Sequence, residues 1–247
     1  MKLSRDKLSH MLARDITRKI IREGMPPGTA IASEAELAEM FGVSRTVVRE
    51  GIQEVVGMGL LLRSQGKSTT IRHRGNWDLL NPKLLAIIMA HDKSAQMIFD
   101  DLFAVRILLE SHAAANAATR RTQEDLVMLE HWLKKMGECV NDTDEFMEAD
   151  LEYHAAVQSA SHDLVVSSIL RGIRDLLETS RHFTQQDPPG LATALKQHEA
   201  SFAAIRSGDA DSAYQAMCDH LRWSKEMSVF KYPQSDEVIK NKSAIFR

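Results

Sequence analysis

The chain has 247 residues, 44% apolar and 26% charged, which is typical of a soluble globular protein with one large domain or two ordinary ones. Its net charge of −3 is uneven, because residues 1–75 carry 13 Lys and Arg against 8 Asp and Glu, whereas the rest carries 18 against 26. No membrane span, signal-type segment or metal-type cysteine spacing is present, so we expect a cytoplasmic protein without a membrane partner, in which only the basic segment meets nucleic acid.

The first predicted helix spans residues 6–23, where apolar side chains recur on one helical face. Ser33 and Glu36 then form the S-x-x-E pattern of a capping box at the start of a second helix. Phe41-Gly42-Val43 reads as a short turn, and a third helix follows over residues 45–58. Two helices joined in this way predict a helix-turn-helix.

The third helix opens with Ser44, Arg45 and Thr46, and Arg49 follows one turn later on the same face as Arg45. Arginine can bind O6 and N7 of guanine in the major groove, and each correct contact is worth roughly 1–3 kcal/mol. The serine and threonine hydroxyls suit phosphates beside the groove. We therefore predict DNA contacts by Ser44, Arg45, Thr46 and Arg49, with Ser33 at the start of the preceding helix. The alternative is a solvated, charged helix face.

Two short β-type runs, Leu60–Leu62 and Thr69–Ile71, enclose a polar turn and predict a hairpin. Beside a helix-turn-helix such a hairpin is a wing that can lie on phosphates or enter the minor groove. At its tip we expect Gln65, Gly66 and Lys67 to contact DNA. Residues 1–75 are thus predicted to form a winged helix-turn-helix domain.

The remaining chain shows only helical patterns after a linker and linking helix over residues 76–93. We predict an all-α antiparallel bundle over residues 94–232 and a flexible tail over residues 233–247, which makes the fold mainly α. The expected helices after the wing are 81–90, 95–118, 122–139, 143–160, 163–182, 190–206 and 209–230.

Four side chains of the acidic bundle form a candidate metal site. Asp150 and His154 are spaced i,i+4 and so share one side of a helix, while His198 and His220 lie on two later helices. One carboxylate and three imidazoles suit Zn²⁺, with Ni²⁺ and Mn²⁺ as alternatives, and leave positions open for water or a ligand. Spacing alone also allows each histidine to be a surface or core residue.

Arg106 lies on an otherwise apolar helix, where a buried charge requires a partner. One interpretation is an intrahelical pair with Glu110 at i+4. The other is a guanidinium fork that holds the carboxylate of a bound effector.

The basic segment resembles the GntR family of bacterial transcription regulators over residues 6–72. The matching residues are Pro27-Gly28, Ser33-Glu34-x-Glu36-Leu37-Ala38, Phe41-Gly42-Val43-Ser44-Arg45-Thr46-x-Val48-Arg49-Glu50, Gly59-Leu60 and Gly66-Lys67. Three departures are Ala32, Val47 and Gly51, where proline, proline and alanine are common. Gly51 is less favourable than Ala in a helix by about 1 kcal/mol, which would loosen the recognition helix.

Residues 98–222 resemble the FCD ligand-binding domain of FadR-type GntR regulators. The matching residues are Leu102-x-x-x-Arg106, Leu109-Glu110, Asp150-x-x-x-His154, His198, Ile205, Gly208-Asp209, Ala213 and His220. The resemblance implies a divalent metal held by Asp150, His154, His198 and His220, and an Arg106 that faces the effector pocket.

The resulting hypothesis is a metabolite-responsive transcription regulator, most simply a repressor, and not an enzyme. A homodimer would bind a pseudopalindromic DNA operator, and a small organic or sugar acid would bind the metal and Arg106. Two alternatives stay open: a metal-dependent hydrolase with an accessory DNA module, and a regulator that responds to acyl-CoA. Against the hydrolase, the chain has neither an H-E-x-x-H motif nor a nucleophile elbow.

Overall fold

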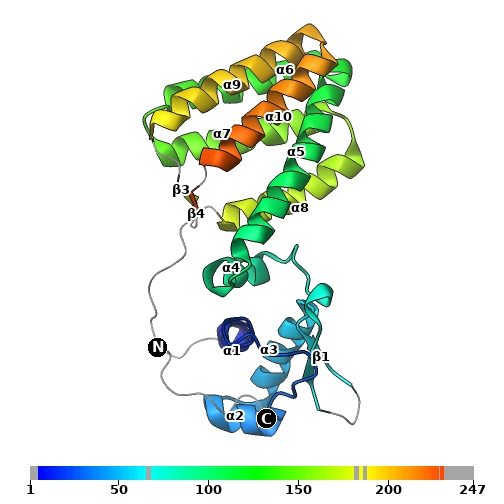
Figure 1. The fold of residues 1–247 in the computed structure, drawn as a ribbon, viewed down its shortest axis with the longest axis vertical. Helices are drawn as coiled ribbons and strands as arrows, with labels where there is room; N and C mark the ends of the chain where they lie inside the picture. The colour runs from blue at the N-terminus through cyan, green and yellow to red at the C-terminus, as the bar shows by residue number, and fades with distance from the viewer. Residues whose placement is uncertain (1–4, 65–67, 181–183, 186–187, 228, 231–247) are drawn as a thin grey trace. The chain divides into compact units, whose positions relative to one another are not determined.

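A computed structural model describes residues 5–64, 68–180, 184–185, 188–227 and 229–230 (Figure 1). The chain forms two compact units, which divide between Ala95 and Gln96. The described residues are mainly helical, as the sequence predicts, and none of their helices is long and apolar enough to cross a membrane.

The first unit is built on three helices, α1 (Arg5–Arg22), α2 (Glu34–Phe41) and α3 (Arg45–Gly57). The apolar face of α1 is buried and packs against α3. The predicted capping box begins α2, since Ser33 and Glu36 bond each other's backbone N–H groups. Gly42 ends α2 with φ +65°, a left-handed conformation that glycine adopts without steric strain, and so turns the chain into α3.

The predicted hairpin is present as two short antiparallel strands, β1 (Leu61–Leu62) and β2 (Thr70–Ile71), in which Leu61 pairs with Ile71. Ala30 forms a further bridge to Thr70. The predicted DNA contacts Gln65, Gly66 and Lys67 lie outside the described residues.

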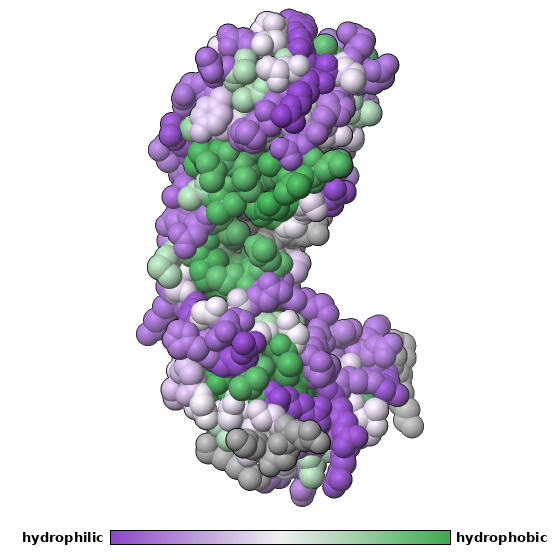
Figure 2. All heavy atoms as spheres, turned by 90° about the vertical axis from the view of Figure 1, so that its right-hand side faces the viewer, coloured by the Kyte–Doolittle hydropathy of each residue, from purple (hydrophilic) through white to green (hydrophobic). Residues whose placement is uncertain are grey.

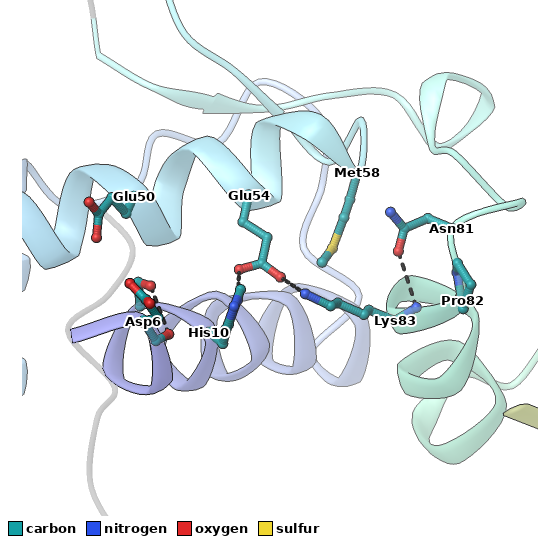
Figure 3. A pocket seen from close by; sticks show the side chains of 9 residues that line it. Asp6, His10, Glu50, Glu54, Met58, Asn81, Pro82 and Lys83 are labelled. Atoms are coloured by element: carbon teal, nitrogen blue, oxygen red, sulfur yellow. Dashed lines mark hydrogen bonds and ion pairs between the residues drawn. The ribbon is translucent and has the colours of Figure 1, made fainter. Parts of the chain in front are cut away.

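A 3-10 turn (η1, Arg74–Asn76) leads to α4 (Pro82–His91), which begins at the Asn81 cap and packs on α1 within the first unit. Figure 3 shows the groove of about 620 Å³ lined by residues of α1, α3 and α4. Glu54 of α3 accepts from Lys83 of α4 and contacts His10 of α1, both at 2.6 Å. One carboxylate therefore ties the helix that leads into the second unit to the helix that carries Arg49.

Gly51 has a packing role that the sequence did not reveal. It is buried in α3, and a Cβ built on it would lie 3.0 Å from both the Leu12 side chain and the Ser9 carbonyl oxygen of α1. Its missing side chain permits the close approach of α1 and α3. The expectation that Gly51 only loosens the recognition helix was therefore incomplete.

The second unit is a helical bundle of α5 (Ala95–Arg120), α6 (Gln123–Glu138), α7 (Thr143–Ala160), α8 (Leu164–Ser180), α9 (Pro188–Ser207) and α10 (Ala210–Met227). Its helix α6 packs on α7 and α9, and α10 packs on α9. The core between them is built mainly from alanine and large apolar side chains, including Phe146, Tyr153, Ile205 and Leu221. The metal-ligand candidates lie on three of these packed helices.

The second unit is not purely helical. A second sheet pairs β3 (Thr184–Gln185) with β4 (Val229–Phe230) in antiparallel register. The sequence gives no strand signal after Ile71, because two-residue strands are too short to show a period-2 pattern. The predicted flexible tail, residues 233–247, lies outside the described residues.

Candidate DNA-reading helix and metal centre

The N-terminus of α3 presents the predicted DNA-contacting side chains to solvent. Ser44 caps the helix by accepting from the Val47 N–H, at 3.4 Å. Arg45, Thr46 and Arg49 are exposed, whereas the intervening Val47 and Val48 are buried. The helix is thus fixed by its apolar face while its first turn is free to meet a groove.

Glu34, at the start of α2, is a residue that the sequence reasoning did not select. Its two carboxylate oxygens accept from Arg49 Nε at 2.7 Å and from Arg63 Nη2 at 2.5 Å. It thereby holds arginines from the recognition helix and from the end of β1 beside each other. Ser33, next to it, is already bonded to Glu36 through both its hydroxyl and its N–H. No local pattern marks Glu34, because its partners lie 15 and 29 residues away.

The four predicted metal ligands converge inside the second unit. One ligand atom from each of Asp150, His154, His198 and His220 lies within 4.8 Å of all the others. His154 Nε2 is 3.3 Å from His220 Nε2, and His198 Nε2 is 2.7 Å from Asp150 Oδ1. The three histidines are buried, with at most 3% of their surface exposed. Helices α7, α9 and α10 bring these side chains together, as the i,i+4 spacing and the later histidines suggested.

The outward nitrogens of two histidines meet polar partners. Nδ1 of His154 lies 2.6 Å from Oε2 of Glu110, and Nδ1 of His220 lies 3.0 Å from Oε1 of Gln197. The Glu110 contact of His154 is an ion pair without hydrogen-bond geometry, and Nδ1 of His198 has no hydrogen-bond partner among the described residues. Glu110 and Gln197 were not identified from the sequence as parts of this cluster.

The pKa shifts of His198, His220 and Asp150 favour the charge states that metal binding requires, which are neutral imidazoles and an ionised carboxylate. Burial lowers the pKa of His198 and holds the pKa of His220 well below its usual value. Burial alone would raise the pKa of Asp150, but the His198 hydrogen bond and the neighbouring histidines outweigh it and lower that pKa.

Arg106 is buried and its Nε donates to Oε1 of Glu110 at 2.7 Å. The intrahelical pair considered from the sequence is therefore present. Burial raises the pKa of Glu110, but the Arg106 charge and His154 outweigh this effect and bring the pKa to about 2. Arg106, Glu110 and His154 thus form a buried chain that ends at the histidine cluster.

The donor set fits a divalent cation. An ionised Glu110 can only accept, so a proton on Nδ1 of His154 is favoured, and the Gln197 carbonyl oxygen favours the same for His220. The Nε2 lone pairs of His154 and His220 then face each other at 3.3 Å beside the Asp150 carboxylate. A cation at the centre would turn this unfavourable arrangement into four bonds.

An exposed helix in a winged helix-turn-helix domain, followed by a separate helical domain, is the architecture of a DNA-binding transcription regulator. Residues 8–71 match the family described as "Bacterial regulatory proteins, gntR family", and residues 101–222 match the FCD domain. The chain belongs to the GntR family of transcription regulators and carries the FCD type of second domain.

Two curated relatives are similar over most of their length. The "Putative L-lactate dehydrogenase operon regulatory protein" of Escherichia coli is 32% identical, over 87% of this chain and 84% of its own. The "Galactonate operon transcriptional repressor" of the same species is 30% identical, over 81% and 87%. These relatives are transcription regulators, as the non-enzymatic prediction requires, and not hydrolases.

A solved structure supports the same fold. The solved structure described as "Lar controls the expression of the Listeria monocytogenes agr system and mediates virulence" superposes on this chain with a TM-score of 0.59. The two sequences are 16% identical. The match covers 92% of this chain and 98% of that one.

Proposed function

We propose that this regulator senses a small hydroxycarboxylic acid through a divalent metal held by Asp150, His154, His198 and His220. The observation that carries the proposal is the convergence of these four buried side chains, with ligand atoms within 4.8 Å of one another. Zn²⁺ is the first choice for an O,N,N,N donor set, with Ni²⁺ and Mn²⁺ as the alternatives.

The effector class follows from chemistry and from the two relatives. Their names refer to L-lactate dehydrogenase and galactonate operons, and lactate and galactonate are both 2-hydroxycarboxylates. A carboxylate and its neighbouring hydroxyl can bind one metal through two oxygens, at positions that four protein ligands leave open. The Nε of Arg106 donates its hydrogen bond to Glu110, and we assign the two Nη groups as donors to the effector carboxylate.

We further propose that the regulator acts as a homodimer and, most simply, as a repressor on a pseudopalindromic operator. One recognition helix reads only one half-site, so two copies are needed to read a palindrome. Figure 2 shows hydrophobic side chains gathered on one face of the helical unit. Exposed apolar residues of α5 and α8 include Val105, Leu108, Leu164, Val165 and Ile169. Such a face suits contact with a second copy.

A thermal-shift screen tests the sensing proposal. The protein is stripped with a chelator and heated with Zn²⁺, Ni²⁺ or Mn²⁺, each with and without L-lactate, D-galactonate or palmitoyl-CoA. We expect the metal to raise the Tm and a hydroxy acid to raise it further only in its presence, because a ligand that binds the native state stabilises it. Stabilisation by the acyl-CoA alone would instead favour the acyl-CoA alternative.

A further inference from the structure

We propose that Glu110 and Gln197 are positioning residues that fix the tautomers of His154 and His220, so that both Nε2 lone pairs face the metal. This inference rests on the proposed metal site. It assigns a function to two residues that are not metal ligands themselves. It also gives the buried Arg106 a role in the site before any effector is bound.

The Glu110 side chain has one partner on each carboxylate oxygen. Oε1 accepts from Arg106 Nε at 2.7 Å, and Oε2 forms an ion pair with Nδ1 of His154 at 2.6 Å, without the geometry of a hydrogen bond. Glu110 is 4% exposed, so water does not compete for either oxygen. Since an ionised carboxylate has no proton to donate, it favours a proton on Nδ1 and leaves the lone pair of a neutral imidazole on Nε2.

Gln197 acts on His220 from another helix. Its Oε1 lies 3.0 Å from Nδ1 of His220, and as a carbonyl oxygen it can only accept. Gln197 precedes His198 on α9, so one helix supplies both a ligand candidate and the partner that orients a neighbouring ligand. His154 and His220 are thus held from opposite outer sides while their Nε2 atoms lie 3.3 Å apart.

His198 differs from both of these histidines. Its Nδ1 has neither a hydrogen bond nor an ion pair in the described part of the chain, and its Nε2 contacts Asp150 Oδ1 at 2.7 Å. His198 is oriented by a fellow ligand rather than by an outer residue. The structure therefore predicts that two of the three histidines depend on outer partners.

Glu110→Gln makes a sharp test, because Arg106 has only donors to offer. The amide oxygen of the new side chain must face Arg106, so its NH₂ group faces Nδ1 of His154. The variant would then favour the His154 tautomer with its proton on Nε2, and metal binding through Nε2 would first have to reverse that preference. Gln197→Met removes the acceptor of His220 without leaving a buried charge, and Gln197→Glu restores an acceptor.

The experiment measures zinc affinity by competition with a chromophoric chelator, in the full-length protein. We expect Glu110→Gln and Gln197→Met each to weaken zinc binding by about 10–100-fold, the usual effect of removing an outer partner of a metal ligand. Gln197→Glu should stay within a few-fold of the wild type. The control is Glu145→Gln, which makes the same change at an exposed site on the helix of His154. It should leave the zinc affinity unchanged.

Ring ¹⁵N NMR of the metal-free protein, with labelled histidine, reports the tautomer of each histidine. A purely structural role of Glu110 and Gln197 would leave these tautomers unchanged. We expect Nδ1–H tautomers for His154 and His220 in the wild type, and an Nε2–H tautomer for His154 in Glu110→Gln. Unchanged tautomers together with unchanged zinc affinity in both variants would overturn the inference. If Glu110→Gln does not fold, the zinc affinity and the His220 tautomer of Gln197→Met decide whether the inference holds. A wild type that binds no zinc but shows these tautomers would refute the metal site alone.

Discussion

Arg49 and Arg45 occupy exposed positions on a helix whose opposite face is buried, which is the arrangement that direct DNA readout needs. Arg49 is 63% exposed in its side chain although it pairs with Glu34. Such an exposed pair contributes little to stability, so the arginine can exchange Glu34 for a base at small cost.

We predict that Arg45→Ala or Arg49→Ala weakens specific operator binding, because each lost base contact costs about 1–3 kcal/mol, or roughly 5–150-fold in affinity. Fluorescence anisotropy with an operator selected from a random-sequence pool measures the change. The Tm should be that of the wild type, and Arg171→Ala, an exposed arginine of the helical unit, is the control. Specific binding retained in both variants would exclude these arginines as readers.

His198→Ala should abolish stoichiometric metal binding, because it removes one of four converging donors from the centre of the cluster. Elemental analysis of purified protein measures the metal content. His131→Ala, which replaces an exposed histidine on α6, should keep its metal. Equal metal content in the two variants would refute the ligand set.

At the scale of elements, the helices could be predicted because apolar residues recur at helical spacing and because Ser33, Ser44 and Asp142 cap them visibly. The i,i+4 spacing indicates Asp150 and His154 as candidate ligands, and the resemblance to the FCD domain implies the full set with His198 and His220. What the sequence hid are contacts between distant segments. Glu34, Glu110 and Gln197 meet their partners only after folding, and the strands β3 and β4 are too short to leave a pattern.

Gly51 shows how packing can reverse a propensity. We predict that Gly51→Ala lowers the Tm, because the new Cβ would press on the Ser9 carbonyl and on Leu12 at 3.0 Å, and overpacking costs about 1–3 kcal/mol, more than the gain in helix propensity. Gly57→Ala on the same helix meets nothing within 4 Å and should keep or raise the Tm. Differential scanning calorimetry compares them, and a higher Tm for Gly51→Ala would refute the packing role.

At the scale of the whole molecule, the apolar face of α8 is only partly covered. Leu170 and Ile173 pack with Ala113 of α5, whereas Val165 and Ile169 of the same face are exposed. The apolar face of an amphipathic helix is normally covered. The exposed part of this face therefore supports the proposed dimer.

We predict that Leu108→Glu converts a dimer to a monomer and weakens operator binding, since a charge cannot be buried unpaired in an apolar interface. Sedimentation velocity measures the mass of each species. Met128→Glu replaces an apolar residue on α6 that is 50% exposed, against 63% for Leu108, and should leave the assembly unchanged. A dimer that survives Leu108→Glu would place the interface elsewhere.

The two units are connected along the chain through α4 and α5. Helix α5 carries Arg106 and Glu110, it follows α4 after three residues, and Lys83 of α4 is bonded to Glu54 of the recognition helix. An effector can change DNA binding only if it binds one arrangement of the protein more tightly than another.

The most direct test of the proposed sensing function is a titration of the selected operator with zinc-loaded protein, with and without L-lactate or D-galactonate. We predict that one of these hydroxy acids changes the Kd of the wild type at least tenfold, and that it changes nothing in His198→Ala, which should still bind the operator through α3. An acid that leaves the wild-type Kd unchanged, or that shifts both proteins equally, would contradict a metal-bound effector as the signal.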